Sequence, residues 1–296
     1  MVIVFGSINL DLAFGLPHLP APGETVLGPR VALGPGGKGA NQACAAARDG
    51  ARVLMAGAVG RDALAEQALV LLREAGVDLS RVAAVDAAAT GCAAVCTDEA
   101  GRNLIAVGSG ANLLARGAQV DDEVLGPEAV LLCQMECAAA ETAGLIRRAR
   151  ARGARAVLNL APAGPLDPAA LRDLALLLVN EHEAAWLAGH LGCTADAAGL
   201  RRALSGVGVV RTLGEAGAEW SAAEGEGRVA SRQVHVVDTA GAGDCFAGVL
   251  AAALSRGAPL AIAVARANTA AALSCTRLGT QASLPGAAEI EAALSG

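Results

Sequence analysis

The stretch from Asp238 to Asp244, DTAGAGD, places two acidic residues around a run of Ala and Gly directly before an expected helix. Small residues let backbone N–H groups approach a ligand closely, and a helix start adds unpaired donors and a positive dipole end. We therefore predict an anion hole that binds a phosphate at Gly241, Ala242 and Gly243. A lone Asp244 would more often be a helix cap, but the preceding Gly-Ala-Gly favours a catalytic position.

A second glycine-rich stretch, GPGGKGAN from Gly34 to Asn41, contains the only lysine of the chain, Lys38, beside twenty-two arginines elsewhere. A compact ammonium group fits a tight glycine loop better than a branched guanidinium does. We predict that Lys38 faces a ligand crevice near a transferred phosphate. The alternative is that Lys38 only tethers the loop.

Two familiar nucleotide motifs fit this loop poorly. A P-loop fails because Ala32 stands where its first glycine belongs and Gly39 follows the lysine. The spacing of Gly34, Gly36 and Gly39 matches GxGxxG, yet the next expected strand runs into Gly57 without the acidic residue of a dinucleotide site. An NAD-binding oxidoreductase is therefore a less favoured alternative.

Short apolar runs alternate with Ala/Leu/Arg-rich amphipathic segments along most of the chain. This alternation predicts a doubly wound, mostly parallel α/β sheet flanked by helices, with ligands at the carboxyl ends of the strands. The expected strands are Val2–Phe5, Val53–Ala56, Val130–Cys133, Ala156–Asn159, Leu176–Asn180, Val207–Thr212 and Gln233–Val237. The expected helices are Asn41–Asp49, Asp62–Ala75, Ala139–Arg152, Pro168–Arg172, Glu183–Leu191 and Gly243–Ser255.

Two segments depart from this rhythm and predict a small β-sheet lid. One is rich in Pro and Gly with short strand-like pieces at Thr25–Leu27 and Val31–Leu33, and the other is a hairpin of Gly91–Thr97 with Asn103–Val107. We expect the lid to comprise residues 12–34 and 90–108, and the core residues 1–11, 35–89 and 109–296. Such a lid would expose apolar side chains and favour a homodimer through it, at Val26, Val31, Val95 and Ile105.

Composition excludes several classes of partner. The formal net charge is −6 and aromatic residues make up 2%, which argues against a broad nucleic-acid surface. No uncharged 18-residue span predicts a membrane helix, and MVIVFGSINLDL lacks the basic start of a signal peptide. The eight cysteines form no CxxC motif, so we expect buried thiols in a cytoplasmic protein.

Six stretches in fixed order resemble the PfkB-type family of sugar and nucleoside kinases, and most closely its ribokinase-like branch. They are GSINLDL, GPGGKGANQA, NEHEA, RTLGEAG, DTAGAGDCFAG and SCTRLGTQASLP. The resemblance covers essentially the whole chain. It implies ATP-dependent phosphorylation of D-ribose at its primary hydroxyl, with Asp244 as general base and the backbone anion hole around the phosphoryl group.

The resemblance also implies a role for each matching residue. The sugar would bind Asn9, Asp11, Gly37, Lys38, Gly39, Asn41, Glu136 and Asp244. The nucleotide would contact Asn180, Thr212, Gly214, Gly217, Gly243 and Asn268, in an aliphatic adenine pocket. Glu183 would help hold Mg²⁺ through water. K⁺ would bind beside the anion hole, mostly through backbone oxygens, at Asp238, Ala240, Ser274, Arg277, Gly279 and Ser283.

Other functions on the same fold stay open at this point. A kinase of fructose, deoxyribose, pseudouridine or another nucleoside is the nearest alternative, although scarce aromatic residues disfavour stacking on a base. A non-catalytic sugar-binding protein is more distant, since such a protein has no need of Asp244.

Overall fold

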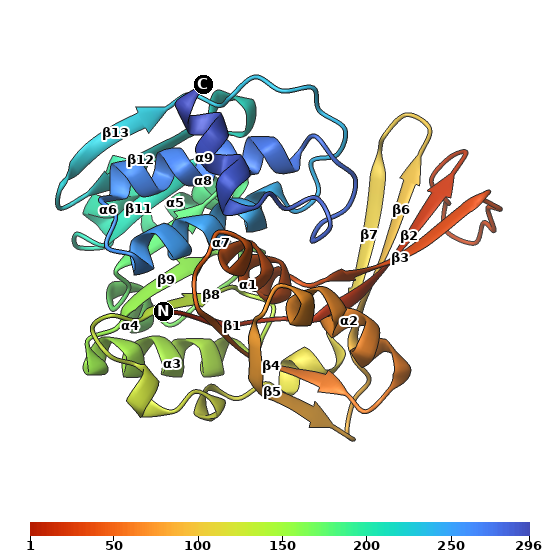
Figure 1. Ribbon diagram of the computed structural model, residues 1–296, viewed down its shortest axis with the longest axis horizontal. Helices are drawn as coiled ribbons and strands as arrows, with labels where there is room; N and C mark the ends of the chain where they lie inside the picture. The colour runs from red at the N-terminus through yellow and green to blue at the C-terminus, as the bar shows by residue number, and fades with distance from the viewer.

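The computed structural model describes residues 1–296 and contains a nine-stranded sheet and a separate four-stranded sheet (Figure 1). The large sheet has the order β13-β12-β11-β10-β9-β8-β1-β4-β5, and its strands are parallel except β12 and β13 at one edge. The predicted mostly parallel α/β sheet is confirmed. Its strands are β1 (Val2–Phe5), β4 (Val53–Gly60), β5 (Asp78–Val85), β8 (Val130–Cys133), β9 (Arg155–Asn159), β10 (Leu176–Val179), β11 (Gly208–Thr212), β12 (Ala218–Ala222) and β13 (Gly225–Val229).

Helices cover both faces of this sheet, because alternate residues of the central strands point into two separate apolar clusters. Val2 and Val4 of β1 belong to one cluster, whereas Ile3 and Phe5 belong to the other. The first cluster is covered by α1 (Lys38–Arg48), α2 (Ala63–Glu74), α7 (Ala242–Ser255), α8 (Leu260–Ser274) and α9 (Ala287–Ser295). The second is covered by α3 (Ala139–Arg152), α4 (Pro168–Arg172), α5 (Glu181–Leu191) and α6 (Ala197–Ala203). Short 3₁₀ turns lie at Gly110–Leu114, Gly117–Gln119, Asp122–Val124 and Gly214–Ala216.

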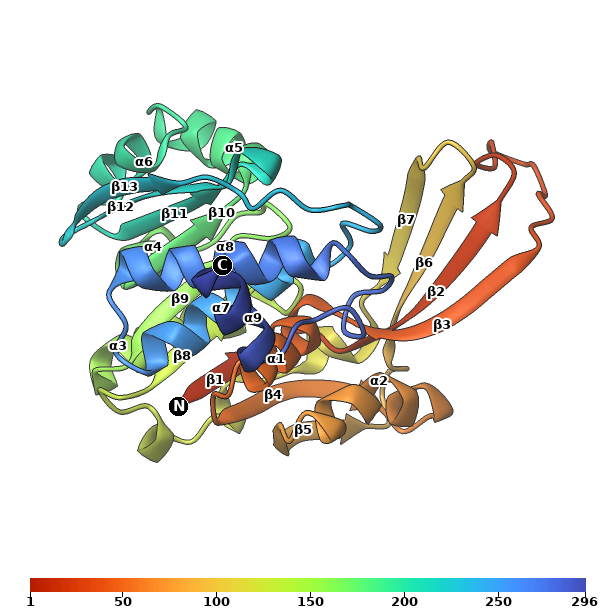
Figure 2. The same ribbon diagram turned by 45° about the horizontal axis from the view of Figure 1, so that its top comes forward.

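The small sheet projects from one side of the helical layers, as both ribbon views show (Figures 1 and 2). It has the order β3-β2-β6-β7, with β2 (Asn9–Leu16), β3 (Arg30–Gly36), β6 (Gly91–Asp98) and β7 (Asn103–Gly108). Val31 and Ile105 are exposed on it, while Val26 and Val95 are half-buried. Because β2 starts at Asn9, this sheet begins before residue 12, and the division of the chain into lid and core stays a prediction.

Two expected strands are wrong. Thr25–Leu27 is irregular, and Gln233–Val237 is an extended loop rather than a sheet strand. The hairpin β12–β13, which the sequence pattern did not predict, already occupies that edge of the large sheet. The loop therefore runs outside the sheet, and the N–H groups of Val237 and Asp238 donate to the carbonyl of Cys275.

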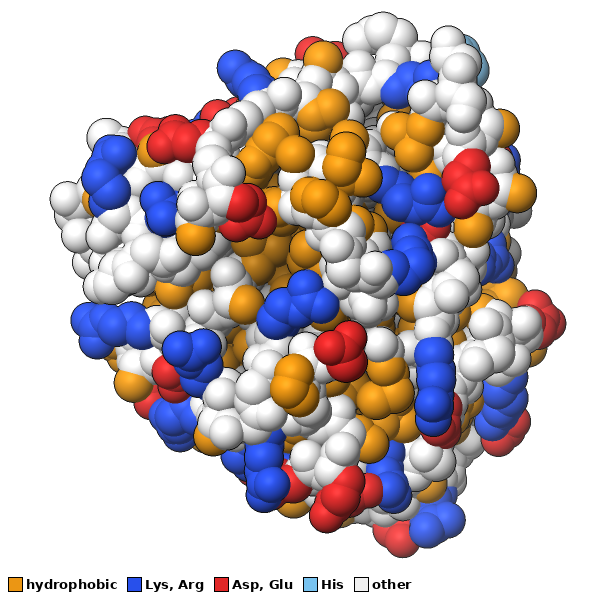
Figure 3. All heavy atoms as spheres, turned by 60° about the vertical axis from the view of Figure 1, so that its left-hand side comes forward, with side chains coloured by type: hydrophobic (Ala, Val, Ile, Leu, Met, Phe, Trp, Pro, Cys, Tyr) orange, Lys and Arg blue, Asp and Glu red, His pale blue; other side chains and the backbone are white.

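The face in Figure 3 intermixes basic and acidic side chains and shows no broad basic area. No helix is both long and apolar enough to cross a membrane.

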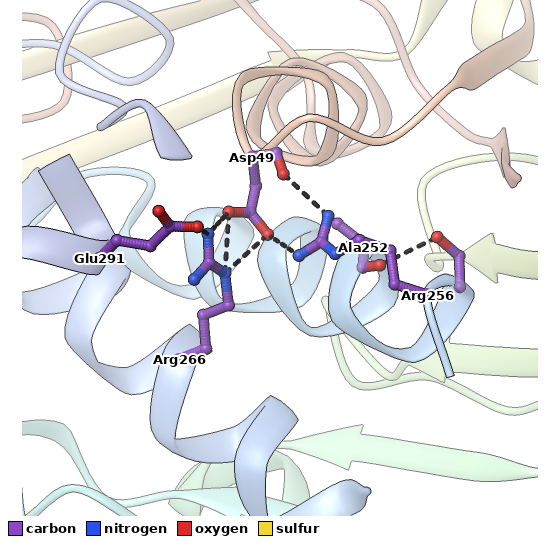
Figure 4. A network of polar contacts seen from close by, with 6 residues as sticks. Asp49, Ala252, Arg256, Arg266 and Glu291 are labelled. Atoms are coloured by element: carbon purple, nitrogen blue, oxygen red, sulfur yellow. Dashed lines mark hydrogen bonds and ion pairs between the residues drawn. The ribbon is translucent and has the colours of Figure 1, made fainter. Parts of the chain in front are cut away.

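A buried ion cluster joins the C-terminal ends of α1 and α7 to the middle of α8 (Figure 4). Asp49 follows α1, and its side chain is fully buried. Arg256, at the end of α7, donates to the carboxylate of Asp49 at 2.6 Å and to its backbone carbonyl at 2.8 Å. Arg266 of α8 adds a forked contact, and Glu291 of α9 lies 3.6 Å from that guanidinium. The cluster therefore fixes α1, α7 and α8 relative to one another.

We expect Asp49→Ala to lower the free energy of unfolding by about 3 kcal/mol, because it leaves two guanidinium groups without their shared anion. Urea denaturation measures the change. Glu66→Ala removes an exposed partner of Arg73 and serves as control, with little change expected. Equal effects of the two substitutions would contradict a structural role for the cluster.

Candidate active site

The N-termini of α1 and α7 meet at one point, beside the first residues of the lid strand β2. Side chains of Asn41 and Gln42 in α1 reach Asp244 in the first turn of α7. Further along, an ideal Cβ on Gly248 would lie 2.3 Å from the carbonyl oxygen of Gln42. Only glycine permits this approach, so the packing of α7 on α1 sets how far Asp244 stands from the Lys38 loop.

Of these two helices, only α7 has backbone N–H groups at its start without a partner in the protein. The N–H of Lys38 donates to Glu136, and that of Gly39 to the hydroxyl of Ser7, so α1 satisfies its first donors within the protein. On α7, Ala242 makes a long bond of 3.3 Å to Thr239, whereas the N–H of Gly243 has no acceptor in the chain. An ideal Cβ on Gly243 would meet no atom within 4 Å, so open space adjoins this donor. This geometry is suited to an anion at α7.

The carboxylate of Asp244 is almost fully buried and accepts one hydrogen bond at each oxygen. Asn41 donates at 2.9 Å and Gln42 at 2.8 Å. Asn41 in turn accepts from Gln281 at 3.1 Å, and Gln42 accepts from Gln134 at 2.7 Å. The carboxylate is thus held in one orientation at the helix start, as a proton acceptor would need to be.

Lys38 is the one cationic side chain in a strongly acidic crevice. The negative charge of Asp244 raises the pKa of Lys38 above its ordinary value, against the opposing effect of burial, with further support from Glu136, Glu183 and Asp11. The ammonium group therefore stays charged beside the proposed base. A role of Lys38 toward a transferred phosphate stays a prediction.

Asp11 is an acceptor without a partner in the protein. Its Oδ1 atom is buried and receives no hydrogen bond. Burial, followed by the charges of Glu136 and Asp244, raises the pKa of Asp11 to about 6. An ideal Cβ on Gly36 would lie 2.1 Å from this carboxylate, so glycine there makes room for it. A buried unpaired carboxylate oxygen costs free energy unless a ligand supplies a donor.

The remaining predicted sugar residues surround Asp11. Asn9 accepts from Asn112 at 2.7 Å, which leaves its amide N–H groups free to donate. Glu136 accepts from Ser7 and from the backbone of Lys38. Gly37 adopts a φ of 88° that favours glycine, and an ideal Cβ there would lie 2.8 Å from the backbone of Asn9. The amide of Asn41 is mostly occupied by Asp244 and Gln281, with one N–H remaining for a ligand.

A cavity of about 600 Å³ adjoins the start of α7. Five of the six predicted nucleotide residues line it, namely Thr212, Gly214, Gly217, Gly243 and Asn268. Phe246, Ala271 and Ala272 also line it, so the wall includes one aromatic ring beside the expected aliphatic side chains. Asn268 is oriented by a hydrogen bond to the carbonyl of Ala230.

Asn180 does not line this cavity. It forms a capping box with Glu183, in which each side chain accepts the backbone N–H of the other residue at 2.8 Å. Burial raises the pKa of Glu183, whose other carboxylate oxygen has no bond within the protein. The helix-cap role of these two residues is therefore established, and a role toward magnesium stays a proposal.

The predicted cation residues lie in two segments, the loop before α7 and the end of α8 with the loop that follows it. Asp238 accepts from the N–H groups of Ala240 and Gly279. The hydroxyls of Ser274 and Ser283 donate to nearby carbonyls, and the side chain of Arg277 pairs with Glu289 on the surface. Only the backbone of Arg277 could therefore face a cation. No group of three or more His, Cys, Asp or Glu residues is arranged to hold a metal ion.

Four side chains of the site were missed by sequence reasoning. Gln42 and Gln281 stand inside two of the quoted motifs but were given no role. Gln134 follows a strand and Asn112 lies in a short 3₁₀ turn, and neither position carried a signal, because only the tertiary fold brings them to Gln42 and Asn9.

Comparisons with known proteins give matches that cover nearly the whole chain. Residues 1–287 match the model of the pfkB family of carbohydrate kinases. A ribokinase of Bacillus subtilis (strain 168) is 36% identical over 296 residues, covering 99% of each chain. A crystal structure of ribokinase from Thermotoga maritima superposes with a TM-score of 0.92 at 30% identity, over 100% of this chain and 99% of that one. A structure of Arabidopsis thaliana ribokinase complexed with ribose and ATP gives 0.88 at 26% identity, over 100% and 98%.

We expect Gly248→Ala to cost about 1–3 kcal/mol of stability and to lower turnover, because the methyl group must push α7 away from Gln42. Gly144→Ala is the matched control, since its Cβ would meet nothing within 4 Å in the middle of α3. That substitution should stabilise the protein by up to about 1 kcal/mol. Thermal unfolding of both variants measures this, and a neutral Gly248→Ala would contradict the close packing.

Proposed function

The chain belongs to the pfkB family of carbohydrate kinases, and on this premise we propose that it transfers the γ-phosphoryl group of ATP to the primary hydroxyl of D-ribose. One observation carries the proposal. The clamped carboxylate of Asp244 lies near enough to Asp11 for its charge to raise the pKa of that group, and it directly follows Gly243, which has a free backbone donor and lines the 600 Å³ cavity. A sugar kinase needs a sugar-binding group, a general base and a nucleotide cavity next to one another in one crevice.

The reaction is a direct displacement at phosphorus. The hydroxyl oxygen of the sugar forms a bond to the γ-phosphorus, and the bond from that phosphorus to the bridging oxygen breaks. The hydroxyl proton passes to Asp244, and ADP leaves with the electron pair of the broken bond. Phosphoryl transfer depends mainly on alignment and charge neutralisation, which the fixed carboxylate and the helix start supply.

The chain provides two sources of positive potential for the migrating group. The N–H groups at Gly241, Ala242 and Gly243 form the backbone anion hole, with Gly243 the most open of the three. Lys38 lies across the crevice, its charge maintained by Asp244 and the other carboxylates. A small ammonium group in this glycine-tight loop meets the phosphate without displacing the sugar.

The sugar would be held by the acceptors and donors around Asp11. The ionised carboxylate of Asp11 accepts from two adjacent hydroxyls, which satisfies its unpaired oxygen. Asn9 donates through its free amide, and Glu136 accepts at the opposite side, with Gly37, Lys38, Gly39 and Asn41 forming the loop beneath the ring. Both faces of the sugar are then bonded to groups that the fold has already fixed.

The residues present fit Mg²⁺ and K⁺. Glu183 retains a free carboxylate oxygen at the acidic crevice, able to order a water on Mg²⁺, and Asn180 holds it in place. Magnesium, when bound, neutralises charge on the phosphates. The two segments that contain Asp238, Ala240, Ser274, Arg277, Gly279 and Ser283 offer oxygen ligands, the type that a hard cation such as K⁺ prefers.

We also propose a homodimer through the small sheet and residence in the cytoplasm. Val31, Leu33 and Ile105 are each more than half exposed on this sheet, which favours burial against a second copy. The free cysteines suit a reducing compartment.

The proposed reaction is tested by coupling ADP release to an optical readout. Ribose, deoxyribose, fructose and nucleosides serve as acceptors with saturating ATP. We expect the highest kcat/KM with ribose. Equal or higher kcat/KM with another acceptor would reassign the sugar, and inactivity with all of them would refute the kinase.

Asp244→Ala should lower kcat by about 10²–10⁴-fold while ATP still binds, because the variant has no proton acceptor at the helix start. Asp62→Ala is the control, since Asp62 caps α2 and has no place in the crevice. It should reduce stability without a specific loss of turnover. A kcat for Asp244→Ala within tenfold of the unaltered protein would remove Asp244 from the mechanism.

The pKa of Asp11 near 6 predicts the pH dependence of sugar use. A raised carboxyl pKa means that the acceptor form is lost as pH falls through 6, so kcat/KM for ribose should drop about tenfold per pH unit below it. The measurement uses limiting ribose and saturating ATP between pH 5 and 8. Asp11→Asn should have a lower value that no longer changes in this range, and an unchanged acid limb in that variant would assign the dependence to another group.

A further inference from the structure

The hydrogen bonds around Asp244 have a single possible direction. An ionised carboxylate only accepts, so Asn41 and Gln42 must present their NH₂ groups to it. Their carbonyl oxygens then point outward, where they can only accept. Gln281 and Gln134 fill these places with their own NH₂ groups. The charge of Asp244 therefore determines the orientation of four surrounding amides.

The burial of Gln134 and Gln281 costs free energy. Gln42, Gln134 and Gln281 are at most 1% exposed. The outward oxygens of Gln134 and Gln281 are buried without a hydrogen-bond partner, which is rare for polar groups in folded proteins. Apolar side chains of the same shape would fill this volume at lower cost. Packing alone therefore does not account for amides at these positions.

Glycines in the backbone leave space for the hydrogen-bonded pair of Gln42 and Gln134. An ideal Cβ on Gly6 would lie 1.9 Å from the Oε1 atom of Gln134, so the residue that follows strand β1 is a glycine where that amide needs space. On the other side, Gly248 lets α7 approach the backbone of Gln42. Two close approaches thus hold the pair against Asp244.

We propose that Gln42 and Gln134 are positioning residues that orient the carboxylate of Asp244 toward the sugar hydroxyl, with Gln134 acting only through Gln42. This inference rests on the proposed function. With one amide donor at each oxygen, the plane of the carboxylate is fixed, and each oxygen keeps a lone pair for the sugar hydroxyl. Without Gln42, the carboxylate can rotate about its Cβ–Cγ bond and leaves the line of attack.

Methionine variants test the proposal, because methionine keeps the length and volume of glutamine and removes the amide. Gln42→Met and Gln134→Met should each lower kcat by about 10- to 100-fold, with KM for ribose and the affinity for ATP within about twofold. The double variant should be no slower than Gln42→Met alone, since Gln134 has no separate contact with Asp244. Gln119→Met is the matched control: its half-buried amide donates to the carbonyls of Gly57 and Arg81, so it should change thermal unfolding but leave kcat intact.

Each other outcome overturns the proposal. Unchanged kcat in Gln42→Met shows that the amide does not orient the base. Multiplying losses in the double variant show that Gln134 acts independently, and a rise in KM without a fall in kcat assigns the pair to binding. An unaltered protein that phosphorylates none of the sugars refutes the proposed function and the inference with it. Active unaltered protein together with fully active variants refutes the inference alone.

Discussion

The site depends on the close packing of two helices whose N-termini lie side by side. Helices usually keep their backbones apart by the width of side chains, but Gly248 lets α7 approach α1 at Gln42. At the other end, Arg256 binds Asp49 and prevents the pair from sliding. A displacement at either end would move Asp244 relative to Lys38, so the geometry of the crevice follows from contacts outside it.

Charge explains why the chain retains one lysine there. The crevice gathers the carboxylates of Asp11, Glu136, Glu183 and Asp244, which would repel the phosphates of a nucleotide if nothing opposed them. Backbone donors at Gly243 supply a positive potential without adding volume. Lys38 adds a full charge beside these carboxylates, in a loop where an added Cβ at Gly37 would approach the backbone of Ser7 to Asn9.

The sequence predicted the parts of the molecule that local chemistry determines. The buried strands of the parallel sheet and the glycine-rich start of α7 have unbroken patterns, and β8, α3 and α4 were predicted with the bounds that the structure gives. The strand expected at Gln233–Val237 was wrong because local apolar content does not reveal that another hairpin occupies the sheet edge. Gln134 and Asn112 could not be found for a similar reason: they contact Gln42 and Asn9 across 92 and 103 residues of chain. Asn180 and Glu183 show a different limit of sequence reasoning. The same two residues fit both a helix cap and a role toward a metal ion, and the sequence does not separate the two roles.

The central claim is that one clamped carboxylate accepts the proton while the start of α7 holds the phosphoryl group. A crystal structure of the unaltered protein with ribose and a non-hydrolysable ATP analogue tests it most directly. The account predicts the primary hydroxyl of ribose within hydrogen-bonding distance of a carboxylate oxygen of Asp244, in line with the terminal phosphorus of the analogue, whose oxygens accept from Gly243. A hydroxyl turned away from Asp244, or a terminal phosphate outside the start of α7, would contradict it.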